Sequence, residues 1–286
     1  MRTLSVAGER PVAPNALDVL TLIDRVAREL RLDYLVTGAT ARDVLLYHVF
    51  GLETGRATLD VDLAVAVDSW PEFERVKTRL IETGEVTTDD MRPHRLFYRT
   101  SEGGKYPLDL LPFGGLEQRP SEIAWPPDLS VVMNVAGYRE ALAAAEQVEL
   151  RVGLIVRVAS LPSLAILKLF AWGDRGVGDS RDAFDFGILL HSYAEAGNED
   201  RLYGDEMPLL EAVGYDVDLA SARLLGKDAA RIIEPATRAQ VIALLDDLMR
   251  RERLTADTAR AFRAVEDRIA TAQIMIDQFR HGLADA

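Results

Sequence analysis

Three aspartates stand inside short apolar runs, where a carboxylate has no ordinary structural use. Asp60 and Asp62 lie one residue apart in LDVDLAVAV (59–67), and Asp109 lies in YPLDLLPFGG (106–115). Side chains two residues apart on a strand point to the same face, so the first two carboxylates are expected side by side. They repel each other unless a cation lies between them, and a divalent ion such as Mg²⁺ takes oxygen ligands of this kind. If the two strands are neighbours, the third aspartate completes a site for two metal ions.

A glycine turn precedes this pair. Gly38 follows a short predicted strand, 34–37, and comes just before a predicted helix, 41–50. A helix N-terminus presents free N–H groups and a partial positive charge, both of which favour phosphate, and glycine lets the backbone approach closely. Each feature alone has a common structural explanation, such as a solvent-facing strand or a hydrogen-bonded aspartate. Their order along the chain, however, favours a phosphate site followed by a metal site.

Two stretches farther along carry more charged residues. SLPSLAILKLFAWGDR places Lys168 on the apolar face of a predicted helix. There it either extends its ammonium group to solvent, or reaches into the site and holds phosphate. SRDAFDFGILL places Arg181, Asp182 and Asp185 at a helix start, where acids often only complement the helix dipole.

The composition limits the class of protein. With 286 residues, 48% hydrophobic and 28% charged, the chain is long enough for two domains of ordinary size. A net charge of −13 does not favour binding to nucleic acid or anionic membranes through bulk charge. There are no cysteines and only four scattered histidines, so disulfides are excluded and a zinc site is disfavoured.

The distribution of apolar residues argues against export and membrane insertion. The first twenty residues lack a long apolar segment of the kind found in signal peptides. We find no stretch of about 18 apolar residues that would cross a membrane. The expectation is a cytoplasmic protein with no membrane partner.

Strand and helix signals alternate in the first part of the chain, and helix signals alone follow. Strands are predicted at 34–37, 59–67, 95–99, 106–111 and 148–158, and helices at 15–30, 41–50 and 71–83. After Ser160 we predict helices at 162–174, 181–195, 207–212, 218–225, 235–249 and 255–283. The predicted fold class is therefore α+β: a mixed sheet with flanking helices over residues 1–159, followed by an all-helical domain over 160–286.

The order of these motifs resembles the nucleotidyltransferase superfamily that includes DNA polymerase beta, the CCA-adding enzymes and the aminoglycoside nucleotidyltransferases. That pattern is a Gly-Gly/Ser turn, an Asp-x-Asp/Glu strand and a separate third Asp. Here Ala39 stands where Gly or Ser is usual, and the spacing from Gly38 to Asp60 is long. GATARDVLL also resembles a CCA-adding enzyme motif whose Arg-Asp pair shapes the site, a role that would fall to Arg42 and Asp43.

GATARD, LDVDL, LDLLPFGG, LKLFAW and RDAFD together are similar to the AbiEii-type (also MenT-type) nucleotidyltransferases, the toxins of bacterial toxin–antitoxin pairs. The resemblance covers about residues 35–190. It implies a nucleotidyltransferase fold and the transfer of a nucleoside monophosphate from an NTP to a hydroxyl, with release of pyrophosphate. The implied acceptor is a tRNA 3′ end or a protein hydroxyl, the implied outcome is growth arrest, and a cognate antitoxin is a possible partner.

The resemblance also implies roles for particular residues. Asp60, Asp62 and Asp109 would hold Mg²⁺ or Mn²⁺. Lys168 and Asp182 from the helical domain would complete the catalytic site, with Asp185 as the alternative to Asp182. The residues that it assigns to nucleotide binding are Gly38, Ala39, Thr40, Arg42, Lys168, Arg181 and Asp185.

Two other functions remain open at this point. An aminoglycoside-type enzyme that modifies a small molecule is one alternative, because an acidic chain favours cationic substrates. A non-catalytic module with the same fold is the other. The three apolar-flanked carboxylates argue against it, because each unpaired buried acid would cost several kcal/mol.

Overall fold

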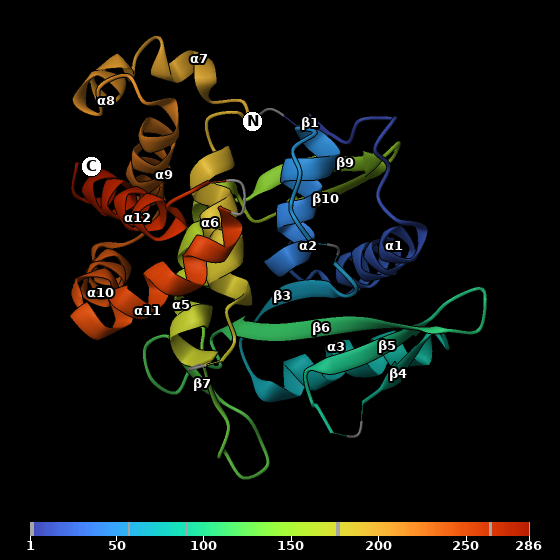
Figure 1. Ribbon diagram of the computed structural model, residues 1–286. Coiled ribbons are helices and arrows are strands. Elements are labelled where there is room, and N and C mark those ends of the chain that lie inside the picture. Colours follow the sequence, from blue (N-terminus) through green and yellow to red (C-terminus); the bar gives the residue numbers. More distant parts are fainter. Residues whose placement is uncertain (1–2, 57, 90, 176–177, 263–264, 286) are drawn as a thin grey trace. The chain divides into compact units, whose positions relative to one another are not determined.

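A computed structural model describes residues 3–56, 58–89, 91–175, 178–262 and 265–285 (Figure 1). The chain divides into two compact units. The first, here called the sheet unit, comprises Met1–Val44 and Arg56–Ala159, and the second, the helical unit, comprises Leu45–Gly55 and Ser160–Ala286. This division differs from the predicted one because the segment 45–55, predicted in the first domain, groups with the helical unit.

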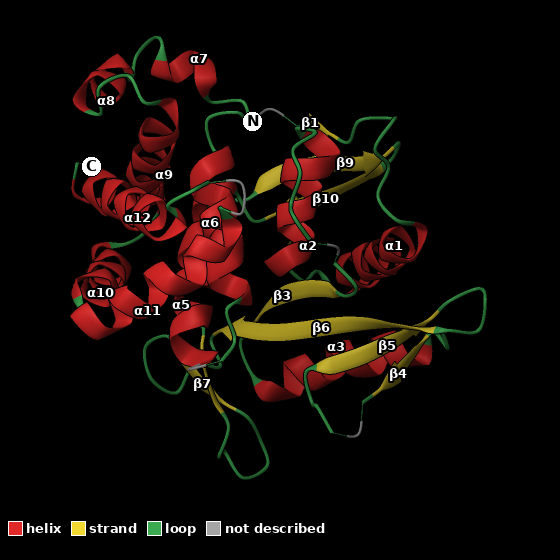
Figure 2. Cartoon of the chain, in the orientation of Figure 1, coloured by secondary structure: helices red, strands yellow, loops and turns green. Residues whose placement is uncertain are grey.

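The sheet unit is built on one mixed sheet, whose strands are yellow in Figure 2. In order across the sheet they are β1 (Leu4–Ser5), β9 (Glu146–Arg151), β10 (Leu154–Val158), β2 (Tyr34–Val36), β3 (Val61–Val67), β6 (Lys105–Gly114), β5 (Arg95–Arg99) and β4 (Val86–Thr88). The pairs β1–β9, β10–β2 and β3–β6 are parallel, and the others are antiparallel. A separate antiparallel pair is formed by β7 (Glu122–Ala124) and β8 (Val132–Asn134).

The helices of the sheet unit form where the sequence supplies their signals. They are α1 (Pro14–Leu30), α2 (Gly38–Asp43), α3 (Trp70–Glu82) and α4 (Tyr138–Ala143). In α1, apolar side chains at helical spacing are buried, and the helix ends at Arg31 in the left-handed conformation. In α3, the Ser69 side chain caps the first turn by accepting a hydrogen bond from the Glu72 N–H.

The chain after β2 differs from the predicted turn and helix. The helix begins at Gly38 itself rather than at residue 41, and after Asp43 it continues as a π-helical segment, η1 (Val44–Val49). The glycine therefore lies at the first helical position, and only Thr37 separates it from the strand.

The helical unit contains no strand among the residues that the structure describes. Its helices are α5 (Leu161–Arg175), α6 (Arg181–Ser192), α7 (Glu199–Leu202), α8 (Met207–Ala212), α9 (Val217–Ile232), α10 (Pro235–Asp246), α11 (Leu248–Thr258), the 3₁₀ turn η2 (Ala259–Ala261) and α12 (Arg268–Ala284). The predicted α+β class, a mixed sheet followed by an all-helical region, is confirmed.

Three predicted helices in this unit have wrong boundaries: 218–225 continues to Ile232 in α9, and the other two are divided for a local reason. The predicted helices 235–249 and 255–283 are replaced by α10, α11, η2 and α12. Asp247 and Asp267 each accept a hydrogen bond from a backbone N–H three residues on, so each starts a new helix. Asp247 therefore ends α10 and starts α11 well before residue 255.

Helices α9 and α12 pack closely because glycine lies at their contact. A Cβ atom added to Gly226 would lie 2.1 Å from the carbonyl oxygen of Phe279, and one added to Gly282 would lie 2.0 Å from that of Arg223. Only a residue without a side chain allows the two backbones to approach this far.

Candidate active site

Parallel pairing of β3 with β6 brings the predicted carboxylates together in the sheet unit. The register places Asp62 directly opposite Asp109, and Asp60 immediately precedes β3. Each of the three residues offers one carboxylate oxygen, and these oxygens all lie within 4.8 Å of one another. The three residues are partly exposed, so an ion from solvent can reach them. The cluster could hold a metal ion.

The turn at Gly38 packs directly against one of these carboxylates. Gly38 has a φ of +62°, and a Cβ atom there would lie only 2.1 Å from Oδ2 of Asp62. The next backbone N–H, that of Ala39, donates to the same Oδ2 at 3.3 Å. The Thr40 hydroxyl donates to the backbone carbonyl of Asp60 at 3.0 Å. The glycine turn therefore holds two of the three aspartates in position.

Arg42 is completely buried, and it binds the segment of chain that leads to Asp60. Its Nε and Nη2 donate to Oδ1 of Asp43 at 2.9 and 2.6 Å, and Nη2 also donates to the carbonyl of Arg56 at 3.2 Å. The Thr58 hydroxyl donates to the other oxygen of Asp43. This network ties α2 to Arg56 and Thr58, shortly before Asp60. A shaping role for the Arg-Asp pair stays a prediction.

Arg95 is a residue of this site that the sequence analysis missed. Its Nε donates to Oδ1 of Asp109 at 2.6 Å and its Nη2 to Oδ2 at 2.5 Å, a bidentate pair. Nη2 also lies 3.4 Å from Oδ2 of Asp60. The hydrogen bonds to Asp109 raise the pKa of the Arg95 guanidinium above its usual value, although burial offsets part of the rise.

The sequence did contain a signal for this arginine. Two strands, 95–99 and 106–111, were predicted with a turn at 101–104 between them. In the structure this hairpin pairs Arg99 with Lys105 and, four residues farther along, Arg95 with Asp109. The register of the predicted hairpin therefore places an arginine opposite the third aspartate.

A second charged cluster lies within the helical unit. Nζ of Lys168 on α5 lies 2.9 Å from Oδ1 of Asp182 and 2.7 Å from Oδ2 of Asp185, both on α6. All three side chains are buried. The remaining oxygen of Asp182 lies 3.1 Å from Nη1 of Arg175. Burial lowers the pKa of Lys168, but the two aspartates raise it more, so its pKa lies above the usual value.

This cluster shows whether the ammonium group of Lys168 reaches solvent. A lysine that extends to solvent keeps its ammonium group in water, whereas here the ammonium group is enclosed and paired with two carboxylates. The interpretation in which Lys168 extends its ammonium group to solvent is therefore wrong. The role of Lys168 and Asp182 in nucleotide transfer stays a prediction.

Arg181, at the start of α6, pairs with Asp179. Its Nη2 lies 2.6 Å from Oδ2 of Asp179, and its Nε donates to Oδ1 of the same carboxylate at 3.0 Å. The hydrogen bond from Arg181 holds the pKa of Asp179 well below its usual range. The predicted site residues thus form two groups, one in each unit: the three aspartates with residues 38–42, and Lys168 with the two acids of α6.

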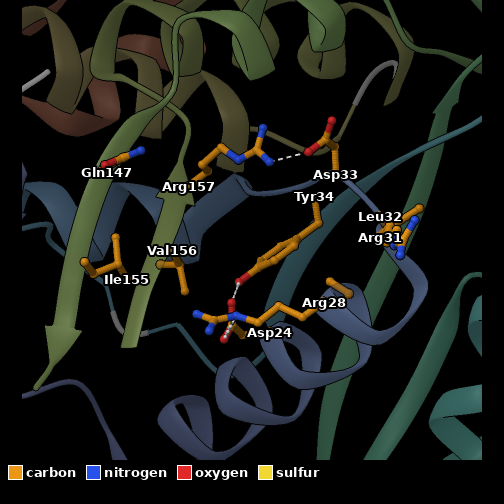
Figure 3. Close-up of a pocket in the computed structure, with 11 residues that line it drawn as sticks. Asp24, Arg28, Arg31, Leu32, Asp33, Tyr34, Gln147, Ile155, Val156 and Arg157 are labelled. Atoms are coloured by element: carbon orange, nitrogen blue, oxygen red, sulfur yellow. Dashed lines mark hydrogen bonds and ion pairs between the residues drawn. The ribbon is translucent and has the colours of Figure 1, made fainter. Parts of the chain in front are cut away.

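A polar hollow of about 390 Å³ lies elsewhere in the sheet unit (Figure 3). Two of its arginines are paired with acids: Arg28 with Asp24 at 2.9 Å, and Arg157 with Asp33. Arg31 also lines it. The Tyr34 hydroxyl donates to Asp24 at 3.3 Å, and burial, together with this carboxylate, raises the pKa of Tyr34. Because both of its acids are already paired with arginine, we assign no chemistry to this hollow.

Among the described residues, no helix combines the length and the apolar character needed to cross a bilayer.

Comparison with known proteins bears on the class of this chain. The profile of a family described as "Nucleotidyl transferase AbiEii toxin, Type IV TA system" matches residues 21–272. Among curated protein sequences, none matches this chain.

Several solved structures are distantly similar. One is an antigenic nucleotidyltransferase-like protein from Paracoccidioides brasiliensis, with 16% identity over 71% of this chain and 93% of that one and a TM-score of 0.43. Another is ANT(2″)-Ia in complex with adenylyl-2″-tobramycin, with 15% identity over 70% and 96% and a TM-score of 0.38. A third is the Thermotoga maritima CCA-adding enzyme complexed with tRNA, with 14% identity over 100% and 85% and a TM-score of 0.28. At TM-scores this low, the similarities say nothing specific about this chain.

A mixed sheet that carries three clustered carboxylates beside a glycine turn is the arrangement expected of a nucleotidyltransferase. The family profile covers most of the chain, and the chain belongs to the AbiEii nucleotidyltransferase toxin family. The resemblance seen in the sequence is thereby confirmed, and so is the class of enzyme.

Proposed function

We propose that this chain transfers a nucleoside monophosphate from an NTP to a hydroxyl group and releases pyrophosphate. The observation that carries the proposal is the cluster of Asp60, Asp62 and Asp109, whose oxygens lie within 4.8 Å of one another. Nothing in the packing of a sheet requires three acids there, and their mutual repulsion is a cost that metal binding would offset.

The donor set fits a hard divalent cation. Three carboxylates offer oxygen atoms only, which suits Mg²⁺ or Mn²⁺ and does not suit a metal that prefers sulfur or nitrogen. When bound, such an ion polarises the phosphoryl oxygens and makes a nearby hydroxyl more acidic.

The chain's own residues hold and orient the reactants. The acceptor oxygen forms a bond to the α-phosphorus, the bond from that phosphorus to the β-phosphate oxygen breaks, and pyrophosphate leaves. Asp109 accepts or orients the acceptor's proton. Gly38 and Thr40 lie beside the triphosphate.

The proposed acceptor is a hydroxyl of a tRNA 3′ end or of a protein, as expected for a toxin of this family. A small cationic acceptor is the alternative, because a net charge of −13 attracts cations. Membership of a type IV toxin–antitoxin family also implies a cognate antitoxin, and growth arrest is the expected effect of the active enzyme.

The test is a transfer assay with each of the four NTPs, labelled at the α-phosphate, in Mg²⁺. The acceptors are bulk tRNA, a protein extract and an aminoglycoside, each in a separate reaction. Asp62→Asn should lower transfer more than about a hundredfold, because even residues that only support metal ligands are worth 10–100-fold. Asp68→Asn, an exposed aspartate just after β3, is the matched control and should keep the wild-type rate.

The label identifies the acceptor. Labelled tRNA supports the toxin proposal, and a labelled aminoglycoside would replace it with the small-molecule alternative. Wild-type protein that labels none of the acceptors with any NTP, or Asp62→Asn that matches the wild type, would contradict the proposed site.

A further inference from the structure

Arg95 contacts two of the three carboxylates that a metal ion would use. Both oxygens of Asp109 accept hydrogen bonds from Arg95, at 2.6 and 2.5 Å, and Oδ2 of Asp60 lies 3.4 Å from its Nη2. These two aspartates also supply two of the three ligands of the candidate metal site. A guanidinium and a divalent cation repel each other, so each weakens the other's hold on the carboxylates that they share.

The arginine also offsets a repulsion that the fold creates. Pairing of β3 with β6 holds Asp62 opposite Asp109, and Asp60 is next to β3, so three negative groups are close together whatever else is bound. Guanidinium keeps its charge at every pH at which proteins are folded, so this compensation is always available. The Cα of Arg95 is fixed by its pairing in β5, but its long side chain is 18% exposed and therefore reaches solvent.

We propose that Arg95 is a positioning residue that competes with the metal. It holds Asp60 and Asp109 together before an ion binds, and it withdraws from at least one of them when the ion arrives. Arg95 thereby sets the metal affinity of the site. This inference rests on the proposed function, because it requires that the three carboxylates bind a divalent ion.

The experiment measures Mn²⁺ binding to the full-length protein without nucleotide, by calorimetry or by the electron paramagnetic resonance signal of free Mn²⁺. Arg95→Met keeps the length of the side chain but removes its charge. We expect it to bind Mn²⁺ about tenfold more tightly than wild type, the size of one charge-assisted contact. In EDTA the same variant should melt at a lower temperature than wild type, and Mn²⁺ should raise its melting temperature by more.

Two further variants make the measurement specific. Arg99→Met changes an exposed arginine on the same face of β5, four residues along, and should bind Mn²⁺ as the wild type does. Arg95→Lys keeps the charge but loses the bidentate geometry, so its affinity should lie between those of wild type and Arg95→Met.

The outcomes separate this inference from the proposed function. If wild type binds Mn²⁺, Asp62→Asn does not, and Arg95→Met binds no more tightly than wild type, the metal site stands and the role of Arg95 is overturned. If neither wild type nor Arg95→Met binds Mn²⁺, the metal site itself fails, and the inference fails with it. Should Arg95→Met not fold, Arg95→Lys decides: binding about threefold tighter than wild type supports competition, and unchanged or weaker binding refutes it.

Discussion

Replacing Gly38 with alanine adds a single methyl group at the point where the turn meets the metal cluster. An ideal Cβ there would lie 2.1 Å from Oδ2, 2.6 Å from Cγ and 2.7 Å from Cβ of Asp62. Rotation of the carboxylate alone cannot relieve these contacts, because the Cβ of Asp62 is fixed by the strand. The turn and the strand must therefore separate.

The size of the effect follows from the geometry. Contacts of this kind do not occur below 3.0 Å, so the separation from 2.1 Å is about 0.9 Å. A displacement of about 1 Å in a catalytic group costs roughly a hundredfold in rate. Stability falls as well: about 1 kcal/mol for alanine at positive φ, and about 1.5 kcal/mol for the weakened hydrogen bond from Ala39 to Asp62.

The assay compares Gly38→Ala with Gly84→Ala. Gly84 also has positive φ, +76°, but a Cβ there would meet nothing within 4 Å. In urea unfolding, both variants should lose the stability that alanine costs at positive φ, about 1 kcal/mol. Only Gly38→Ala should lose transfer activity and Mn²⁺ binding. If folded Gly38→Ala transfers nucleotide within about threefold of Gly84→Ala, far less than the hundredfold expected, then contact of the turn with Asp62 does not position a catalytic carboxylate.

Three further substitutions test the helical unit. Lys168→Met removes a cation that is buried between two aspartates, so it should lower the free energy of unfolding by about 3–5 kcal/mol; an unchanged denaturation midpoint would contradict the pairing of Lys168 with Asp182 and Asp185. Gly226→Ala places a Cβ 2.1 Å from the carbonyl oxygen of Phe279, and it should cost about 2 kcal/mol in chemical denaturation while Mn²⁺ affinity stays at the wild-type value. The hydrogen bond to Asp218 raises the pKa of His191, so the stability from this pair is fully present below about pH 6.5 and is lost as pH rises through the raised value. His191→Gln should therefore cost more at about pH 5.5 than at about pH 8, by no more than about 0.5 kcal/mol for such a half-exposed pair, and an equal cost at both values would remove the predicted linkage.

Much of the sheet unit could be read from local patterns. Alternation of apolar residues located the strands that carry the three aspartates, because the two faces of a strand have different surroundings whatever its neighbours are. The hairpin turn at 101–104 and the glycine after the first apolar run were equally local signals. The helical character after residue 160 followed from periodicity, although the caps at Asp247 and Asp267 were missed and two boundaries were wrong as a result.

Contacts between distant segments could not be read in this way. The sequence by itself determined which residues could be ligands: three carboxylates, each in an apolar run, near a glycine turn. Only the tertiary structure decided that β3 and β6 are neighbours, because parallel strands are joined through a long connection whose path no local signal specifies. It also decided that Arg95 reaches both Asp109 and Asp60, and that Lys168 is enclosed by two acids of the next helix, because the direction of a long side chain depends on everything packed around it.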